Sequence, residues 1–274
     1  MENKPLNFEE FKKALDGEKS KLQNLNDFNI PTDAYHVRDL TKSQVIPSEN
    51  YSTTVTSPKL DSIETHFRNI EELLIEKIID YKDDLIIGCV AWLTSYRILD
   101  ALAKCKNVQI IVQKEDFLRP DLKTKDRNSW KNILHNKYNK ITCEMARFQF
   151  SEPMEYLSFA CDPTVEGVRC VGNHNSEKSP AFPRMHNKFL VFCRTTKNQD
   201  NSDFRYWPVS LWTGSFNLTQ NATYSLENAI CLTDSTGKNE LINSYLKEHH
   251  QIFTISEKLN WESTWIEPQF RIGT

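Results

Sequence analysis

The chain has 274 residues and a formal net charge of -3, so it can bury a full core, and its overall charge excludes binding nucleic acid by bulk attraction alone. It contains only seven glycines, and none forms the GxGxxG or GxxxxGK pattern, which excludes the loops that hold nucleotide phosphates. No apolar run approaches the ~18 residues of a transmembrane helix, and no basic-then-apolar leader is present. We therefore expect a soluble cytoplasmic protein with no stable membrane association.

The first 57 residues are predicted to form an N-terminal helical extension followed by a linker. Sparse apolar residues at 1–30 have the spacing of one or two amphipathic helices, and 31–58 contains many proline, serine and threonine residues. This extension is interpreted either as a dimerisation or partner-docking arm or as a helical cap on the core. The main domain is expected at 58–254, with insertions at about 114–165 and 194–206, followed by a packing tail at 255–274.

The first block of the main domain has the pattern of a βαβ unit. Two short apolar segments read as buried strands, and the residues before and between them have the apolar spacing of helices. A strand, a helix and a strand at this spacing predict two parallel neighbours in one sheet. The expected elements are a helix from His66 to Tyr81, a strand from Asp84 to Trp92, a helix capped by Thr94 or Ser95 that runs through Ala103, and a strand from Asn107 to Gln113.

Residues 104–147 are locally basic, with eleven Lys and Arg residues against five Asp and Glu residues. Aromatic residues are interleaved with these charges, which suits a surface that binds backbone phosphates and stacks bases. The alternative interpretation is an ordinary solvated helix. The candidate substrate-binding residues are Lys123, Lys125, Arg127, Trp130 and Lys131.

A second His-x-Lys sequence occurs in the same stretch, at His135 and Lys137. Its apolar neighbours fit a helix, on which side chains two apart diverge rather than align. No apolar strand and no Gly-Ser-x-Asn sequence follow it. We therefore do not expect it to form half of an active site.

The histidines and cysteines do not predict a metal site. His249 and His250 are adjacent on a helix expected from Glu240 to Phe253, so their rings project apart, and together with Cys231 they lack the spacing of a zinc site. His66 is expected to be structural. The seven cysteines form no CxxC pair and several lie in apolar segments, as buried thiols do. We expect neither a metal nor another cofactor.

The stretch from Met185 to Ile230 carries the residues expected to do chemistry. His186 and Lys188 are two apart and lead into an apolar strand, so their side chains leave the same face. An imidazole can attack or protonate a phosphate group, and an ammonium can neutralise its oxygens. The pair therefore predicts a phosphate site.

Downstream residues complete this candidate catalytic set. Ser215 and Asn217 follow Gly214, where backbone can approach a ligand closely, and both can donate hydrogen bonds. Glu227 lies in an apolar frame, Leu226 to Ile230, that reads as a buried strand. A buried carboxylate needs a partner, and a histidine is the natural one because the contact fixes its tautomer. The candidate catalytic residues are His186, Lys188, Ser215, Asn217 and Glu227.

This ordered set resembles the phospholipase D superfamily and is most similar to its single-motif nuclease branch. The resemblance covers roughly residues 58–253 and implies an α/β fold, with a mixed β-sheet flanked by helices and a helical N-terminal extension. The family places an aspartate seven residues after the motif histidine, where this chain has Cys193. That aspartate supports structure in the family, so its replacement weakens the match without removing the chemistry. The matching sequences are His186-x-Lys188, Gly214-Ser215-x-Asn217 and Glu227-Asn228.

Metal-independent cleavage of a phosphodiester needs a nucleophile, an acid for the leaving oxygen and neutralisation of charge. One histidine cannot attack phosphorus and protonate the opposite oxygen at once, so a two-fold homodimer would supply the second copy, as the resemblance also implies. One His186 would form a phosphohistidine, and the other would protonate the leaving group and then activate water. Lys188, Ser215 and Asn217 would hold the non-bridging oxygens. Glu227 would orient His186, and the coupled histidines predict a bell-shaped pH profile.

The favoured interpretation is a metal-independent nuclease that cleaves DNA or RNA. A lipid phosphodiesterase with the same chemistry is the first alternative, although it requires an apolar membrane-facing rim that the sequence does not indicate. A catalytically silent dimeric scaffold that binds nucleic acid is the second, and Cys193 favours it. On the plainest alternative, His186 and Lys188 are a core histidine and a surface lysine that happen to be two apart.

Overall fold

The computed structural model describes residues 53–57, 60–114, 128–146, 157–159, 164–172, 184–197, 204–254, 256–259 and 270–272. The helices predicted at 1–30 lie outside these residues. The stretch 53–57, expected to belong to the linker, instead forms an edge strand that pairs with the next one. No helix in the described ranges is long and apolar enough to cross a membrane.

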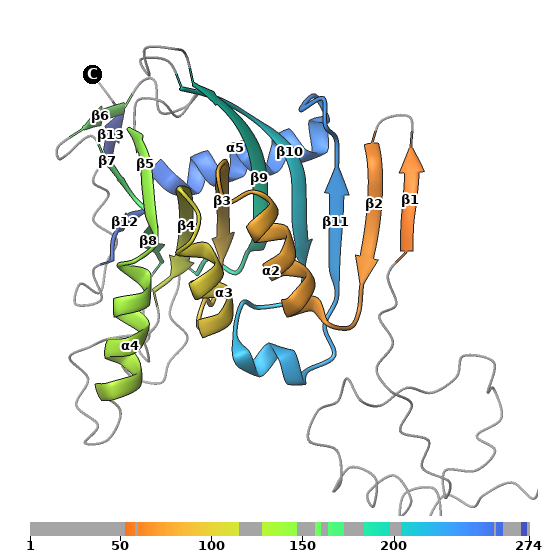
Figure 1. Cartoon of the computed structure of the whole chain (residues 1–274). Coiled ribbons are helices and arrows are strands. Elements are labelled where there is room, and N and C mark those ends of the chain that lie inside the picture. Colours follow the sequence, from red (N-terminus) through yellow and green to blue (C-terminus); the bar gives the residue numbers. More distant parts are fainter. Residues whose placement is uncertain are drawn as a thin grey trace, which may run out of the picture.

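Eleven strands within the described residues form one mixed sheet (Figure 1). Its order is β1-β2-β11-β10-β9-β3-β4-β5-β7, with β8 paired to both β4 and β12. A separate pair joins β6 to β13. The bounds are β1 (Thr53–Ser57), β2 (Leu60–His66), β3 (Leu85–Val90), β4 (Asn107–Gln113), β5 (Thr142–Ala146), β6 (Leu157–Phe159), β7 (Thr164–Glu166), β8 (Val168–Val171), β9 (Lys188–Lys197), β10 (Phe204–Gly214), β11 (Ala229–Thr233), β12 (Glu257–Lys258) and β13 (Phe270–Ile272).

The predicted βαβ unit is present. Strands β3 and β4 are parallel, in register from Leu85 opposite Asn107 to Val90 opposite Val112. The helix between them is α3 (Tyr96–Leu102), and the Ser95 hydroxyl caps it by accepting from the backbone N–H of Ile98 at 3.3 Å. The predicted helix cap and the parallel crossover are therefore confirmed. Both could be predicted because they depend on residues that are close in sequence.

Helices cover both faces of the sheet and define two apolar layers. On one face lie α2 (Ile70–Asp80) and α3, and on the other lies α5 (Glu240–Thr254), as Figure 1 shows. Alternation along β9 feeds both layers: Leu190 and Phe192 pack under α2 and α3, while Phe189 and Val191 pack under α5. A sheet flanked by helices is the expected fold class.

Two predicted boundaries are wrong. The helix expected from His66 begins only at Ile70, because β2 continues to His66, which is in register with Ala229 of β11. The polar segment expected as an insertion at 194–206 is largely the end of β9 and the start of β10, which pair from Phe204 opposite Lys197. Both errors come from strand pairing between segments far apart in sequence.

The insertion expected at about 114–165 also contains parts of the main sheet. Strands β5 and β7 extend the edge beyond β4, and α4 (Asn128–Tyr138) packs nearby through the fully buried Tyr138. The Tyr138 hydroxyl donates to the backbone carbonyl of Leu93 at 2.5 Å. The later helix predicted from Glu240 to Phe253 is confirmed as α5.

Candidate active site

His186 and Lys188 lie at the end of the sheet where β3 finishes and β9 begins. Because these strands are antiparallel, Lys188 is in register with Val90, and the Asn187 carbonyl accepts from the Ala91 N–H at 2.8 Å. Apolar residues follow at once on both strands, so the core fixes the position of this corner. In Figure 1 this is the lower end of the sheet, where the short helix η5 (Gln220–Tyr224) also lies.

The structure brings the two side chains into contact. Lys188 Nζ lies 3.1 Å from His186 Nδ1 and 3.5 Å from Nε2, and it donates to the His186 carbonyl at 3.1 Å. Because Nζ is close to both ring nitrogens, the ammonium lies against the imidazole ring, and the tautomer decides which nitrogen can accept from it. Partial burial lowers the pKa of Lys188, and the nearby negative charge of Glu227 opposes that shift. The pair therefore presents an imidazole beside a cation.

Ser215 and Glu227 meet on the other side of this corner. The Ser215 hydroxyl donates to Oε2 of Glu227 and accepts from the Asn228 N–H at 3.1 Å. The Ser215 N–H donates to the Asn228 carbonyl at 3.1 Å, which ties the end of β10 to the approach of β11. A side chain at Gly214 would place Cβ 2.2 Å from that carbonyl, so only glycine permits this spacing. The contacts fix the Glu227 carboxylate near Lys188.

The apolar frame around Glu227 is not a buried strand, which corrects the sequence interpretation. Strand β11 begins only at Ala229, and Leu226 is 58% exposed. The segment from η5 to β11 passes over the end of the sheet, where no described layer covers it. The hydrogen-bond partner of the Glu227 carboxylate in the described residues is the Ser215 hydroxyl rather than a histidine. Orientation of His186 by Glu227 remains a prediction.

A cavity of about 400 Å³ adjoins these residues. Asn217 and Glu227 line it together with Trp92, whose ring is perpendicular to that of His186 at 6.0 Å between centroids. The Oδ1 atom of Asn217 is buried and has no hydrogen-bond partner within the described part of the chain. The cavity is held between the loop after β3 and the loop after β10, because the Leu218 carbonyl accepts from the N–H of Thr94 at 2.8 Å.

Trp92 is a site residue that the sequence interpretation did not single out. It directly follows a buried strand with a parallel neighbour, and carboxyl ends of such strands are common ligand sites. This position after the strand was the one signal in the sequence that could have identified Trp92 as a candidate site residue. Its contact with the imidazole depends on pairing of β3 with β9, more than ninety residues later in the chain.

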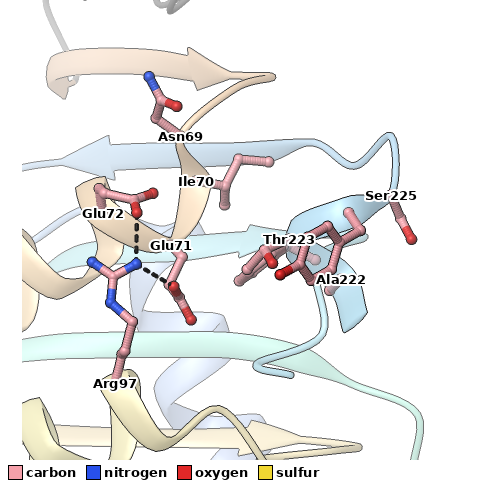
Figure 2. Close-up of a pocket in the computed structure, with 10 residues that line it drawn as sticks. Asn69, Ile70, Glu71, Glu72, Arg97, Ala222, Thr223 and Ser225 are labelled. Carbon is pink, nitrogen blue, oxygen red and sulfur yellow. Dashed lines mark hydrogen bonds and ion pairs between the residues drawn. The ribbon is translucent and has the colours of Figure 1, made fainter. Parts of the chain in front are cut away.

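A second cavity, of about 260 Å³, shares Ala222 and Ser225 with the first (Figure 2). Its one cation, Arg97, contacts Glu71 and Glu72 at 2.7 Å each. Those ion pairs raise the pKa of Arg97 and lower that of Glu72. The guanidinium is already neutralised by two carboxylates, so this cavity is a poor site for phosphate.

Of the predicted substrate-binding residues, the structure describes only Trp130 and Lys131. Lys123, Lys125 and Arg127 lie outside the described residues. Trp130 packs against the core, and Lys131 is 4% exposed, which leaves its ammonium little surface for a phosphate. The role of this basic stretch remains a prediction that depends on 115–127.

The second His-x-Lys sequence lies on α4, as expected. Lys137 contacts Asp100 at 2.5 Å and lies over the Tyr96 ring, while His135 packs against Tyr138. These contacts join α4 to α3. The rejection of this pair as half of an active site agrees with its helical setting.

Three histidines outside the motif have structural partners. His66 stacks on Trp212 at 5.1 Å, and burial lowers its pKa. His249 Nε2 lies 2.6 Å from the Gln109 side-chain oxygen, and His250 Nε2 lies 3.2 Å from the Tyr206 hydroxyl. In the described ranges, no three His, Cys, Asp or Glu side chains are grouped as metal ligands.

Cys193 is fully buried between β3 and β10, and this burial raises the pKa of its thiol. The carboxylate of Asp84 contacts the next two residues of β9, Arg194 and Thr195. Asp84 accepts from the Thr195 N–H at 2.9 Å and contacts Arg194 at 2.6 Å. The far end of β9 is therefore anchored by a different acidic residue, which immediately precedes β3.

Comparisons with known proteins give one clear relative. No protein-family model matches the chain. The uncharacterized protein L381 of Acanthamoeba polyphaga mimivirus is 30% identical over 253 residues, which cover 86% of this chain and 79% of that protein.

Similar solved structures are more distant. Nuc from Salmonella typhimurium, a phospholipase D family member, is 18% identical over 72% of this chain and 96% of its own, with a TM-score of 0.40. NucT from Helicobacter pylori is 14% identical over 74% and 96%, with a TM-score of 0.38. Phosphatidylserine synthase from Haemophilus influenzae is 15% identical over 72% and 40%, also with a TM-score of 0.38. Scores this low carry no argument about function.

Proposed function

Because the chain belongs to the same family as mimivirus protein L381, whose name states no activity, we propose its function from the site itself. The protein is a metal-independent phosphodiesterase of the phospholipase D type that cleaves nucleic acid through a phosphohistidine. The observation that carries this proposal is the 3.1 Å contact between Lys188 Nζ and His186 Nδ1 at a rigid corner of the sheet.

The first step uses His186 as the nucleophile. A neutral ring nitrogen attacks phosphorus, the N–P bond forms, and the bond from phosphorus to the leaving ester oxygen breaks. Lys188 supports this step because its positive charge beside the ring disfavours protonation of the imidazole and neutralises charge on the non-bridging oxygens. The Asn217 side chain lines the adjoining cavity and supplies a further donor, and the Ser215 hydroxyl supplies another when it turns from Glu227 to the phosphate.

The leaving oxygen takes its proton from a second imidazole, the partner subunit's His186. That ring then removes a proton from water, which attacks phosphorus and releases the first His186. Exposed apolar side chains beside the site support pairing of two copies: Tyr224 is 47% exposed and Leu226 is 58% exposed, next to Glu227. Apolar patches of this kind are typical of protein interfaces.

Nucleic acid is the proposed substrate class because the basic stretch at 104–147 suits a phosphate backbone. Within its described part, Lys114 and Lys131 are buried, and Lys106 and Lys137 are ion-paired. Lys104 and Lys140 are exposed, so the charge available to a substrate is assigned to these two lysines and to residues 115–127, which include Lys123, Lys125 and Arg127.

The test is cleavage in EDTA of single-stranded DNA, double-stranded DNA, RNA and phosphatidylcholine vesicles. We expect cleavage of at least one nucleic acid, and loss of that activity in His186→Ala. Brief reaction with a phosphorus-32-labelled substrate should leave an acid-labile, base-stable label on the protein. Turnover of lipid alone would reject the nuclease. Binding without turnover would favour the silent scaffold.

A further inference from the structure

The cavity beside the catalytic pair is built for a group other than phosphate. Trp92, Asn217 and Glu227 line it, and the Trp92 ring also contacts that of His186. Among its described lining residues none is lysine or arginine, and its one charged group, Glu227, already accepts from Ser215. A second phosphate there would find no cation to neutralise it.

The lining combines one aromatic ring with neutral hydrogen-bonding groups. Thr94, Thr219 and Asn221 contribute hydroxyl and amide groups, and Trp92 contributes a large flat apolar face. The buried Asn217 Oδ1 has no partner in the described chain, and leaving such an acceptor unpaired costs free energy. This arrangement favours a ligand that is uncharged, flat and able to donate a hydrogen bond.

The volume is also sufficient. At about 400 Å³ the cavity falls within the range of ~300–1,000 Å³ typical of small-molecule sites. A quaternary ammonium headgroup fits less well, because such cations are held by several aromatic rings. Trp92 is the one aromatic side chain among the described lining residues.

We propose that this cavity is a base-binding subsite, in which Trp92 stacks the nucleobase next to the scissile phosphate and the neutral polar groups of the lining border its edge. The inference rests on the proposed function and adds to it a positioning device. Stacking there fixes the substrate beside His186, so part of the binding energy is used to orient the phosphate. Because every base has a flat face, the subsite favours nucleic acid without requiring one sequence.

The test compares two phosphodiesters with the same leaving group and net charge: thymidine 5′-p-nitrophenyl phosphate and methyl p-nitrophenyl phosphate. We expect wild-type kcat/KM to be about tenfold or more higher for the thymidine ester, as stacking on one aromatic ring permits. Trp92→Ala should remove most of this preference, and Trp92→Phe should keep most of it. An unchanged preference in Trp92→Ala would overturn the subsite.

Two further variants guard against a folding defect. Asn221 is exposed, so Asn221→Trp should narrow the cavity without disturbing the core and lower the preference in the same direction. Phe67→Ala removes an exposed aromatic ring outside the cavity lining and should leave the preference intact. If the wild type cleaves neither ester, the proposed function fails. If it cleaves both equally, only the subsite fails.

The salt dependence of oligonucleotide binding shows whether the cavity holds a base or a phosphate group. For a single-stranded oligonucleotide bound to a His186→Ala background, Trp92→Ala should weaken binding without changing the slope of log Kd against log salt. A slope reduced by about 0.7 would mean that the cavity holds a phosphate, and would reject the assignment of a neutral group.

Discussion

Lys188 Nζ lies 3.1 Å from His186 Nδ1, and both residues precede an apolar run that is buried on each face of the sheet. The contact needs two things at once: a spacing of two residues and a strand that does not move. The first is a property of the local sequence. The second comes from β3 and β10, which pair with β9 along most of its length.

An active site shared by two subunits predicts how activity changes when wild-type and mutant subunits are combined in one dimer. When wild-type and His186→Ala subunits are co-expressed in known proportions, activity should follow the square of the wild-type fraction, because only dimers with two imidazoles complete both proton transfers. Mass measurement by light scattering checks that the mixed preparation is dimeric. Activity that falls in linear proportion would mean that each subunit acts independently of its partner.

Removing the ammonium should cost most of the activity. Lys188→Met is expected to lower kcat by about 10²- to 10³-fold, the range for loss of one preorganised donor to developing charge. Lys188→Arg should recover only part, because the guanidinium cannot place a single point charge against the ring. Thermal melting of each variant provides the control. Full activity in Lys188→Met would contradict the assigned role.

Beyond the bell set by the paired histidines, a second and more alkaline limb of the pH profile should reflect Lys188. Burial lowers the pKa of this lysine below its ordinary value of 10.5, so the ammonium is lost, and activity falls, at a lower pH than for an exposed lysine. The Glu227 charge opposes that shift, so Glu227→Gln should lower the pKa further and move the limb to still lower pH. Measurement of kcat/KM from pH 6 to 10 tests this. A limb that moves to higher pH would contradict the electrostatic role of Glu227.

Stability should fall in acid because of His249. Its side chain is fully buried on α5, and desolvation, with His250 adjacent, holds its pKa well below the ordinary value of 6.5. The unfolded chain therefore binds a proton that the folded chain does not, so the free energy of unfolding decreases as pH falls below about 6.5, by up to about 1.4 kcal/mol per pH unit. Urea denaturation between pH 5 and 8 measures this. The slope should be smaller in His249→Gln, and an unchanged slope would assign it to other groups.

Arg169 should be the most costly charged residue to remove. It is fully buried, donates to Ser256 Oγ at 2.7 Å and to the Ser256 carbonyl at 3.0 Å, and pairs with Glu166. Arg169→Ala leaves these acceptors unpaired and is expected to lower the free energy of unfolding by about 3–5 kcal/mol. Arg184→Ala, at an exposed position, should change it by about 0.5 kcal/mol or less. Equal effects in urea titrations would contradict this interpretation.

The sequence by itself determined the features that depend on near neighbours. The βαβ unit, the Ser95 cap, the helix α5 and the contact of Lys188 with His186 all follow from spacing within a few residues. Apolar periodicity and capping act over one or two turns, so these signals need no knowledge of the rest of the fold.

Only the tertiary structure decided the rest. The end of β2 at His66, the half-buried position of Glu227 outside a strand and the burial of Lys131 depend on which distant segments pair or pack, and each departs from its local pattern. The cavity beside Trp92 exists because the loop after β3 meets the loop after β10 at one end of the sheet. Strand pairing and layer packing join residues a hundred or more positions apart, and the local spacing of residue types does not predict which of these residues meet.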